Sequence, residues 1–329
     1  MNIGILGCGK IASTIAKTLV QMQKEDIFLL ACGSRSLTKA QEFASQFSIK
    51  KAYGSYLEML KDPEIDLVYV ATPHSEHYQN VMLCLENNKH VICEKALTTD
   101  ARRARKMFDY AQEKNLLLTE AIWTRYMPSR KRIMALLEQG IIGKPLEVRA
   151  ELSYPISTKK RLVDPSLAGG SLLDIGIYPL NFLCMFFSTE YSSLKASCTY
   201  TAKHLDKSDT YEIEYPNSLK AKMTSSMVRI SANKGIIIGD KGKMVIKNIN
   251  NPEKITVYSS TGKKALSETV KEDYSGYEYE FRECYQALKN QQIHCPSMPK
   301  EESIRMMEIM DEIRRQLGVV YPFDTEVIS

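Results

Sequence analysis

The sequence predicts an α/β protein: an N-terminal Rossmann domain with a doubly wound parallel sheet, followed by a C-terminal α+β domain with an open, mostly antiparallel sheet. Strand-like and helix-like segments alternate from Met1 to about Thr119, which is typical of a parallel sheet covered on both faces. A glycine turn, Gly7-Cys-Gly9, directly follows the first of these strands. From Pro145 onward, strand-like alternations recur with short turns between them, which is typical of an antiparallel sheet.

In the first domain, apolar runs predict strands and amphipathic spacing predicts helices. The first helix carries Ile15, Ala16, Leu19 and Val20 at helical spacing. The expected strands are 2–6, 27–32, 66–71, 90–93 and 116–119, and the expected helices are 12–21, 37–46, 77–87 and 100–114. Ligands of such a sheet bind at the carboxyl ends of its strands. We therefore expect the functional residues in the segments that follow the strands.

The turn after the first strand predicts a bound dinucleotide. Its sequence, Gly7-Cys-Gly9-Lys10-Ile11-Ala12, matches the G-x-G-x-x-A pattern. Gly7 permits the sharp exit from the strand, Gly9 lets the backbone approach a pyrophosphate, and Ala12 keeps the following helix close to the sheet. That helix directs its first amides, those of Lys10 and Ile11 among them, at the phosphates. The alternative is a structural strand–helix turn without a ligand.

The residues after the second strand favour NADP over NAD. A site that prefers NAD places an Asp or Glu against the ribose hydroxyls. Here the sequence reads Gly33-Ser34-Arg35-Ser36, and Asp26 lies at the wrong end of the strand. The Arg35 guanidinium can pair with a 2′-phosphate and stack on the adenine, while Ser34 and Ser36 add hydroxyl donors. A solvated loop arginine, with NAD as the cofactor, is the alternative.

Small residues and a proline follow the third strand at Ala71-Thr72-Pro73, where they let the cofactor lie across the sheet edge. His77 opens the next helix as a capping or packing residue beside the cofactor, and a metal site with His74 fails for want of further ligands. The fourth strand ends in Glu94-Lys95. A charged pair after an apolar, buried strand is costly unless it is used, so we expect both residues to reach the nicotinamide site.

At these residues the chain resembles the Gfo/Idh/MocA oxidoreductases, whose Glu-Lys-Pro hallmark follows the same strand. Here the hallmark reads Glu94-Lys95-Ala96, so both charges are kept and the proline is replaced. The resemblance continues through Glu120-Ala-Ile-Trp123-Thr-Arg125-Tyr126, Gly143-Lys-Pro145 and Ala168-Gly-Gly170-Ser-Leu-Leu-Asp174-Ile-Gly176-Ile-Tyr178-Pro179. These segments look like the dimeric dihydrodiol dehydrogenase and sugar dehydrogenase branch. They cover about the first 190 residues, and the remainder is similar in architecture.

The resemblance implies a catalytic group of three residues. Asp174 and Tyr178 lie four residues apart, so one face of a helix presents both side chains. Much of the family has His where this chain and its branch have Tyr178. Tyr178 would exchange the alcohol proton, while Lys95 would favour its phenolate form and stabilise the developing alkoxide. Asp174 would orient Lys95 or hold a substrate hydroxyl. A buried tyrosine with a satisfied hydroxyl is the alternative.

Three further residues are expected at the site. The resemblance favours Trp123 as an indole face for a sugar or diol ring and Arg125 as a partner for a hydroxyl or cofactor oxygen. Arg161 can reach the substrate, although it lies in a charge run, Lys159-Lys160-Arg161, and such runs are usually solvated.

The second domain is expected to carry the open sheet and most of the remaining helices. Its expected strands are 146–152, 194–201, 210–215, 220–230, 235–239 and 242–246, with helices at 170–187, 277–290 and 299–317. We place the domains at 1–120 and 121–329, with helix 299–317 able to pack back on the first. The resemblance, and the apolar surface that an uncovered sheet face exposes, imply a homodimer or higher homo-oligomer through this sheet.

Composition excludes several classes of partner. The formal net charge of +5 is small and scattered, so nucleic acid is not expected. The chain begins with a strand, and no apolar run approaches the roughly 20 residues of a spanning helix, so we expect no membrane and a cytoplasmic location. Eight cysteines without a C-x-x-C pair indicate reduced core residues and no metal site.

Together these features predict an NADP-dependent oxidoreductase acting on a secondary alcohol or carbonyl of a sugar-like compound or cyclic diol. NAD use and an inositol-type substrate are alternatives within that class. A regulator that binds the dinucleotide without turnover is the alternative from another class. The presence of Lys95, Asp174 and Tyr178 together argues against a regulator, because a pure binder has no need of them.

Overall fold

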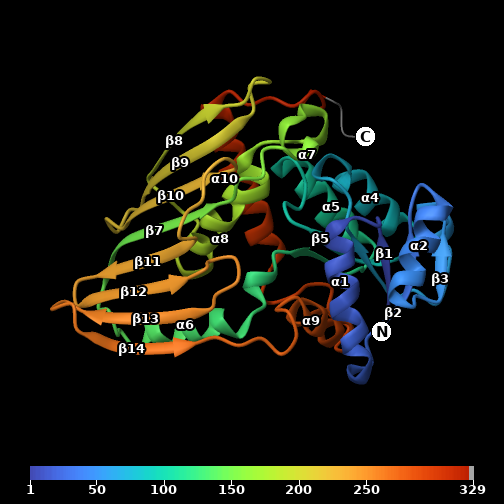
Figure 1. Ribbon diagram of the computed structural model, residues 1–329, viewed down its shortest axis with the longest axis horizontal. Coiled ribbons are helices and arrows are strands. Elements are labelled where there is room, and N and C mark those ends of the chain that lie inside the picture. Colours follow the sequence, from blue (N-terminus) through green and yellow to red (C-terminus); the bar gives the residue numbers. More distant parts are fainter. Residues whose placement is uncertain (326–329) are drawn as a thin grey trace. The chain divides into compact units, whose positions relative to one another are not determined.

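The computed structural model describes residues 1–325, and the chain divides into two compact units. The first unit consists of Met1–Tyr126 and Glu272–Ile304. The second consists of Met127–Lys271 and the chain from Arg305 onward. Each unit contains one of two sheets, and most of their strands are labelled in Figure 1.

The first unit is built on a six-stranded parallel sheet with the order β3-β2-β1-β4-β5-β6. Its strands are β1 (Asn2–Leu6), β2 (Phe28–Gly33), β3 (Lys51–Tyr53), β4 (Leu67–Val70), β5 (His90–Glu94) and β6 (Leu118–Ala121). This is the Rossmann order, so the predicted fold class is confirmed. Ligands of this fold bind where the order reverses, at the carboxyl ends of β1 and β4.

Helices connect these strands, and most of them were predicted. They are α1 (Lys10–Gln21), α2 (Leu37–Phe47), α3 (Tyr56–Leu60), α4 (His74–Glu86) and α5 (Ala101–Glu113), with 3-10 turns η1 (Met22–Glu25) and η2 (Trp123–Arg125). In α5, the Asp100 carboxylate accepts the Arg103 amide at 2.9 Å, which caps the helix. Ala104, Met107 and Phe108 then form its buried stripe. The sequence did not predict β3 and α3, because three and five residues are too short to show a period.

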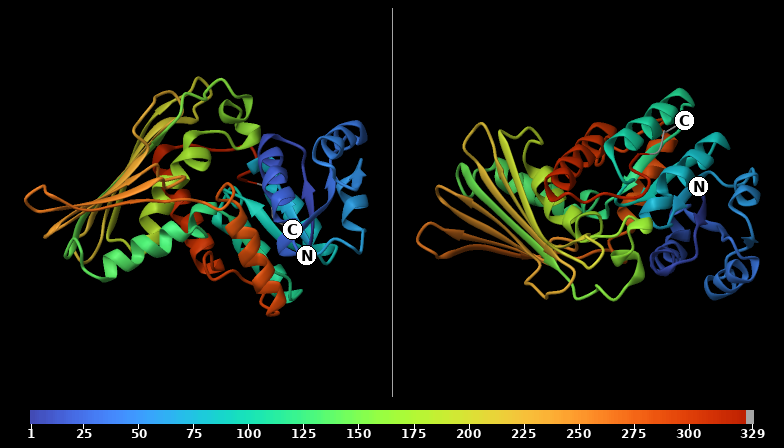
Figure 2. Two further views of the ribbon diagram at one scale, coloured as in Figure 1. Left: turned by 60° about the horizontal axis from the view of Figure 1, so that its bottom comes forward. Right: turned by 90° about the horizontal axis from the view of Figure 1, so that it is seen from above.

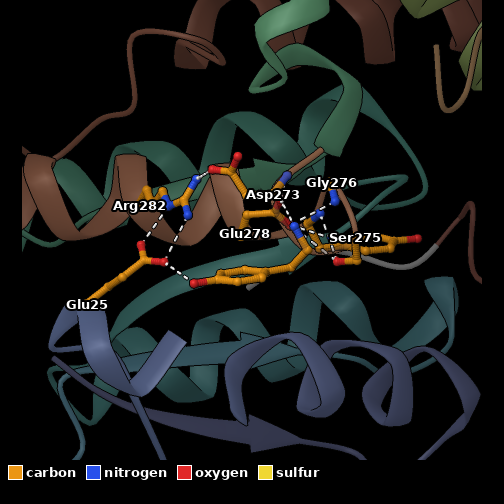
Figure 3. A network of polar contacts seen from close by, with 8 residues as sticks. Glu25, Asp273, Ser275, Gly276, Glu278 and Arg282 are labelled. Carbon is orange, nitrogen blue, oxygen red and sulfur yellow. Dashed lines mark hydrogen bonds and ion pairs between the residues drawn. The ribbon is translucent and has the colours of Figure 1, made fainter. Parts of the chain in front are cut away.

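The segment Glu272–Ile304 joins the first unit through a polar network at the start of α9 (Glu278–Lys289), shown in Figure 3. The buried Glu278 carboxylate accepts main-chain N–H groups of the four residues 273–276 at 2.7–3.1 Å. Arg282 donates to both oxygens of Glu25 at 2.6 and 2.9 Å. Because charge-assisted hydrogen bonds of this kind are the strong ones, they hold α9 on the sheet's own unit.

The second unit is built on an eight-stranded sheet with the order β14-β13-β12-β11-β7-β10-β9-β8. Its strands are β7 (Pro145–Ser153), β8 (Ser193–Tyr200), β9 (Asp206–Glu214), β10 (Lys220–Ser226), β11 (Lys234–Gly239), β12 (Gly242–Lys247), β13 (Lys254–Ser259) and β14 (Lys264–Thr269). Among these strands only β7 and β10 pair in parallel. The sheet is therefore mostly antiparallel, as predicted.

Several elements of the second unit differ from the sequence prediction. Strand β10 ends at Ser226, earlier than the expected residue 230. Strands β13 and β14 were not predicted, because residues 254–269 are rich in Lys, Ser and Thr and show little apolar alternation. The remaining helical elements are α6 (Pro128–Glu138), α7 (Lys160–Val163), η3 (Pro165–Leu167) and α10 (Lys300–Leu317), the last of which spans the boundary between the units.

The helix expected at 170–187 contains a widened turn. Leu172–Gly176 form a π-helix (η4), in which the Ile177 N–H reaches the Leu172 oxygen five residues back, and α8 (Ile177–Phe186) continues from it. Pro179 explains the change. It has no N–H for the Ile175 oxygen, and its ring crowds that carbonyl, so the wider turn is favoured.

This segment also corrects an expectation from the sequence. By length and composition, Pro165–Phe186 is long and apolar enough to cross a membrane, and no such run had been expected. However, 89% of its apolar window is buried inside the fold, which is typical of the core helix of a globular protein. Helix α8 packs on β7 and β10, and Figure 2 shows it on one face of the sheet. No helix of the described residues covers the other face (Figure 2).

We expect Gly170→Ala to destabilise the protein by about 3 kcal/mol, because it combines backbone strain with a steric clash. Gly170 has a φ of +118°, and a Cβ there would lie 2.2 Å from Oδ1 of buried Asp206. Gly262→Ala is the control. Gly262 has a φ of +81°, but an added Cβ there would meet no described atom within 4 Å, so we expect the unfolding free energy to fall by only about 1 kcal/mol. Urea unfolding measures both losses, and equal values would contradict the steric argument.

Candidate active site

Gly7 and Gly9 are glycines for different reasons. Gly7 has a φ of +102°, and a Cβ there would lie 3.0 Å from the Ala71 oxygen, so the protein's own backbone requires glycine. Gly9 has a φ of −96°, and an added Cβ would meet no atom within 4 Å. A glycine that the described residues do not require is expected where a ligand approaches the backbone. Gly9 therefore fits the predicted pyrophosphate.

The amino end of α1 is open to an anion. Gly9 is the N-cap and supplies no side-chain acceptor, and the first turn carries no acidic residue. Lys10 is exposed and Ile11 half-buried, while Ala12 is fully buried. The first amides and the helix dipole can therefore bind a phosphate without competition from a side chain.

The segment after β2 places Arg35 on the surface at the same edge of the sheet. Ser36 is the N-cap of α2, where its hydroxyl accepts the Lys39 amide at 3.4 Å, and the Ser36 amide donates to the Ser34 hydroxyl at 3.3 Å. Asp26 lies at the start of β2, at the opposite end of the strand, as expected. The guanidinium and two hydroxyls thus follow the strand that meets a cofactor's ribose in this fold.

Tyr56 is a neighbour of this segment that sequence reasoning missed. Its Cδ1 lies 3.5 Å from the position that a Cβ would take on Gly33. The positive charge of Arg35 acts to lower the pKa of Tyr56. Burial raises the pKa of Tyr56 against that charge. No sequence signal marks this tyrosine, because it begins the five-residue helix α3, which was itself missed.

The His77 ring bridges the segments that follow β4 and β5. Its Nδ1 lies 2.8 Å from the Ala96 oxygen and its Nε2 lies 2.8 Å from the Thr72 oxygen. The ring is fully buried, and burial lowers the pKa of His77. Ala71 is buried, whereas Thr72 and Pro73 are partly or fully exposed beside it. The described residues contain no group of three His, Cys, Asp or Glu that could hold a metal.

The turn after β5 carries the Glu94-Lys95-Ala96 sequence, and its Lys95–Ala96 peptide bond is cis. The Glu94 carboxylate is buried and accepts the Tyr69 hydroxyl. Tyr69 is fully buried, and its pKa is raised by burial and by the Glu94 charge. Lys95 is half-buried. The two charged residues of the hallmark therefore lie in different surroundings, with Glu94 inside the unit.

Trp123 and Arg125 are both buried in the first unit. The Trp123 ring stacks on Tyr277, with centroids 4.1 Å apart and planes 7° from parallel. Arg125 is only 1% exposed and forms an ion pair with Glu302. Both partners come from the segment that returns to this unit after residue 271, so sequence distance hid these contacts.

In the second unit, Asp174 lies in the π-turn and pairs with Arg161. Arg161 donates through Nη1 to Oδ1 at 2.7 Å and through Nη2 to Oδ2 at 3.1 Å, which is a bidentate arrangement. Arg161 is partly exposed and the Asp174 side chain is buried. Tyr178, one turn later at the start of α8, is 9% exposed. The structure thus joins two predicted substrate residues, Arg161 and Asp174, as a pair that the sequence did not predict.

The buried carboxylate of Asp206 and close packing at neighbouring glycines hold the π-turn in place. Asp206 accepts the Leu172 amide at 2.6 Å, and burial raises the pKa of Asp206 to about 6. A Cβ on Gly176 would lie 2.6 Å from the Tyr211 hydroxyl, and one on Gly169 would lie 2.9 Å from the Leu162 backbone. The glycines around Asp174 are thus required by the unit's own packing.

Two comparisons of sequence place the chain among known proteins. Residues 1–122 match the Gfo/Idh/MocA model described as an oxidoreductase family with an NAD-binding Rossmann fold, and residues 131–245 match the GFO/IDH/MocA C-terminal domain. The chain is 34% identical over 325 residues to trans-1,2-dihydrobenzene-1,2-diol dehydrogenase of Xenopus tropicalis, covering 97% of this chain and 98% of that protein. It is 32% identical over 328 residues to the Homo sapiens protein of the same name, covering 98% of each.

Solved structures share the fold. KijD10, a 3-ketoreductase from Actinomadura kijaniata in complex with NADP and TDP-benzene, has a TM-score of 0.85 at 23% identity, covering 96% of this chain and 97% of that one. UDP-N-acetylglucosamine 3-dehydrogenase GnnA from Acidithiobacillus ferrooxidans has a TM-score of 0.80 at 20% identity, with coverages of 96% and 97%. The chain therefore belongs to the Gfo/Idh/MocA family, as an NAD(P)-binding oxidoreductase of the dihydrodiol dehydrogenase type.

Proposed function

We propose that this protein is an NADP-dependent oxidoreductase that acts on a secondary alcohol or carbonyl group of a sugar-like compound or cyclic diol. The observation that carries the proposal is Gly9, whose missing side chain leaves open space that no described atom fills, directly before an uncapped helix. The relatives named as diol dehydrogenases support the substrate class. When bound, the cofactor supplies a hydride donor or acceptor at nicotinamide C4.

The cofactor contacts follow from the strand ends of the first unit. Gly7, Gly9 and the amides that open α1 would hold the pyrophosphate. Ser34 and Arg35 would hold the 2′-phosphate that distinguishes NADP. Further contacts are proposed for residues at the ends of β4, β5 and β6, namely Ala71, Thr72, Pro73, His77, Glu94, Lys95, Trp123 and Arg125. For His77, Glu94 and Arg125, whose side chains contact the protein itself, the proposed contribution is to hold the strand ends in place.

We expect the protein to bind NADPH more tightly than NADH, and Arg35→Ala to weaken NADPH binding at least tenfold with little effect on NADH. Loss of a guanidinium–phosphate pair, worth about 1.5–3 kcal/mol, is the reason. Quenching of Trp123, the single tryptophan, and nicotinamide fluorescence report binding of both nucleotides.

Gly9→Val is the matched control for this titration. Its Cβ would meet no described atom within 4 Å, so we expect it to weaken both nucleotides equally and to lower the melting temperature only slightly. Equal weakening of NADPH and NADH by Arg35→Ala would contradict the NADP preference. Absence of binding by either nucleotide would show that the glycine turn is structural.

The proton chemistry is assigned to Tyr178 and Lys95. In alcohol oxidation, the Tyr178 phenolate accepts the proton of the substrate hydroxyl while a hydride leaves the carbon that bears that hydroxyl. Carbonyl reduction runs in reverse. A cationic Lys95 favours the phenolate and stabilises the alkoxide that develops on the substrate oxygen.

Asp174 and Arg161 are proposed to bind substrate as a pair. The Arg161 fork engages both carboxylate oxygens, so the Asp174 carboxylate is held in one plane and stays an acceptor. An ionised carboxylate is an acceptor, the kind of group that binds the hydroxyls of a sugar or diol. Arg161 would then act on substrate chiefly through Asp174.

We expect Tyr178→Phe to lower kcat for alcohol oxidation by about 10²–10⁴-fold while the Kd for NADPH changes little, because the proton acceptor is lost and the nucleotide contacts are kept. Lys95→Ala should also lower kcat strongly. Steady-state kinetics over a panel of sugars and cyclic diols, with NADPH titrations of each variant, measures both effects.

The regulator alternative makes the opposite prediction in the same experiment. Wild-type protein that binds NADPH, shows no turnover on any diol, sugar or carbonyl in the panel, and binds NADPH unchanged in Lys95→Ala would favour it. A kcat that survives in Tyr178→Phe would instead reject the assignment of the proton to that phenol.

A homodimer through the eight-stranded sheet is proposed as the assembly. On the face opposite α8, Ile236 lies across from Arg149 and Val245, and Ile238 lies across from Glu147. The three aliphatic side chains are half-buried within the unit. An apolar strip flanked by charges of both signs suits a second copy of the same surface.

We expect the wild-type protein to sediment at twice the mass of one chain, and Ile236→Lys to shift it to the monomer, because like charges would then face each other across the symmetric contact. Analytical ultracentrifugation measures this. Lys50→Glu, an exposed change in the first unit, is the control and should leave the mass unchanged. A wild-type monomer at micromolar concentration would contradict the proposed assembly.

A further inference from the structure

The turn that bears Lys95 is held from the neighbouring strand by a buried carboxyl group. The Leu97 amide, two residues after Lys95, donates to Oε1 of Glu120 at 2.9 Å. Glu120 lies in β6 directly across from Cys93 of β5, and it is 1% exposed. The parallel pairing of these two strands therefore places a carboxyl group under the turn.

The other side chains that contact this turn, His77 and Cys93, do not change charge around pH 7. The Ala96 oxygen faces His77 Nδ1 at 2.8 Å, and the Leu97 oxygen accepts the Cys93 thiol at 3.7 Å. Burial lowers the pKa of His77 and raises that of Cys93, so both groups stay neutral around pH 7. Glu120 is the group among these contacts whose charge changes near neutrality.

The surroundings of Glu120 explain why. Its Oε2 has no hydrogen-bond partner among the described residues, which is unusual for a buried carboxyl oxygen. Burial raises the pKa of Glu120 to about 7, and the Leu97 amide, the nearby Ser303 hydroxyl and the charges of Arg125 and Lys95 limit the rise. Cys93 on β5 and Tyr126, whose hydroxyl donates to the Glu120 main-chain oxygen at 2.9 Å, are further titratable neighbours, and burial raises the pKa of both.

We propose that Glu120 is a positioning residue for Lys95: its carboxylate fixes the turn through the Leu97 amide and attracts the Lys95 charge, and its protonation weakens both interactions. This inference rests on the proposed role of Lys95 in turnover. A carboxylate makes a hydrogen bond about twice as strong as a neutral carboxyl group does. The turn is therefore held more firmly when Glu120 is ionised.

Turnover and stability should respond to pH in opposite directions. Above about pH 7, ionised Glu120 holds the Lys95 turn, so kcat rises through a limb near 7. The folded protein binds more protons at Glu120 than the unfolded chain does, because the folded pKa is raised from 4.5 to about 7. The contribution of Glu120 to stability therefore falls as pH rises through this window. A merely structural carboxyl group would affect stability alone.

The test is Glu120→Gln, which keeps the acceptor oxygen for Leu97 but cannot ionise. We expect kcat to fall about 10–100-fold above pH 7, the limb near 7 to vanish while any limb at higher pH stays, and the Kd for NADPH to stay unchanged. The loss of unfolding free energy between about pH 5 and about pH 9 should become smaller. Glu120→Asp, which keeps the charge but shortens the reach, should retain a titrating limb with a lowered kcat.

Glu278→Gln is the matched control, because Glu278 is also buried in the same unit but holds the segment that precedes α9, through main-chain amides and the Ser275 hydroxyl. It should lower the melting temperature and leave the kcat–pH profile in place. A wild-type profile without a limb near 7, or the same limb in Glu120→Gln, would overturn the proposal. Absence of any wild-type turnover would instead reject the proposed function, and the stability–pH curves would still test whether Glu120 titrates near 7.

Discussion

The parallel pairing of β1, β4 and β5 is the constraint on which the rest of the first unit depends. Hydrogen-bonded registers such as Leu6 with Val70 and Val70 with Cys93 end these strands at one edge of the sheet. Segments far apart in sequence thereby follow one another at that edge, where this fold binds its ligands. The glycine turn, Thr72 and the Lys95 turn are useful only because the strands before them stop together.

In the second unit, close packing takes the place of strand ends as the positioning device. The π-turn that carries Asp174 lies so near Asp206 and Tyr211 that Gly170 and Gly176 have no room for a Cβ. Pro179 removes the hydrogen bond that would tighten that turn into an α-helix. The Asp174 carboxylate is then held by the Arg161 fork. Backbone shape is set by sterics, and the final side-chain direction by charge.

The sequence predicted most of this fold because its signals are local. The glycine turn, the apolar strands and the amphipathic helices each need only a few neighbouring residues, and the hallmark Glu94-Lys95 is contiguous. The missed side-chain contacts depend on distant partners. No residue near Arg125 in sequence indicates its ion pair with Glu302, and none near Trp123 indicates its stacking on Tyr277. Likewise, nothing near Glu94 indicates that its carboxylate accepts the hydroxyl of Tyr69, 25 residues earlier.

Buried carboxyl groups of the first unit show how surroundings decide what an acid can do. Glu278 accepts four main-chain amides and is held as a structural group. Glu280, on the same helix and also fully buried, has no hydrogen-bond partner for either oxygen among the described residues, and burial raises its pKa so far that it stays protonated. Glu120 lies between these extremes, with one amide donor and two nearby cations. A buried carboxyl group with such partial compensation can change charge near neutrality, so the titrating contact proposed for the Lys95 turn needs no dedicated motif.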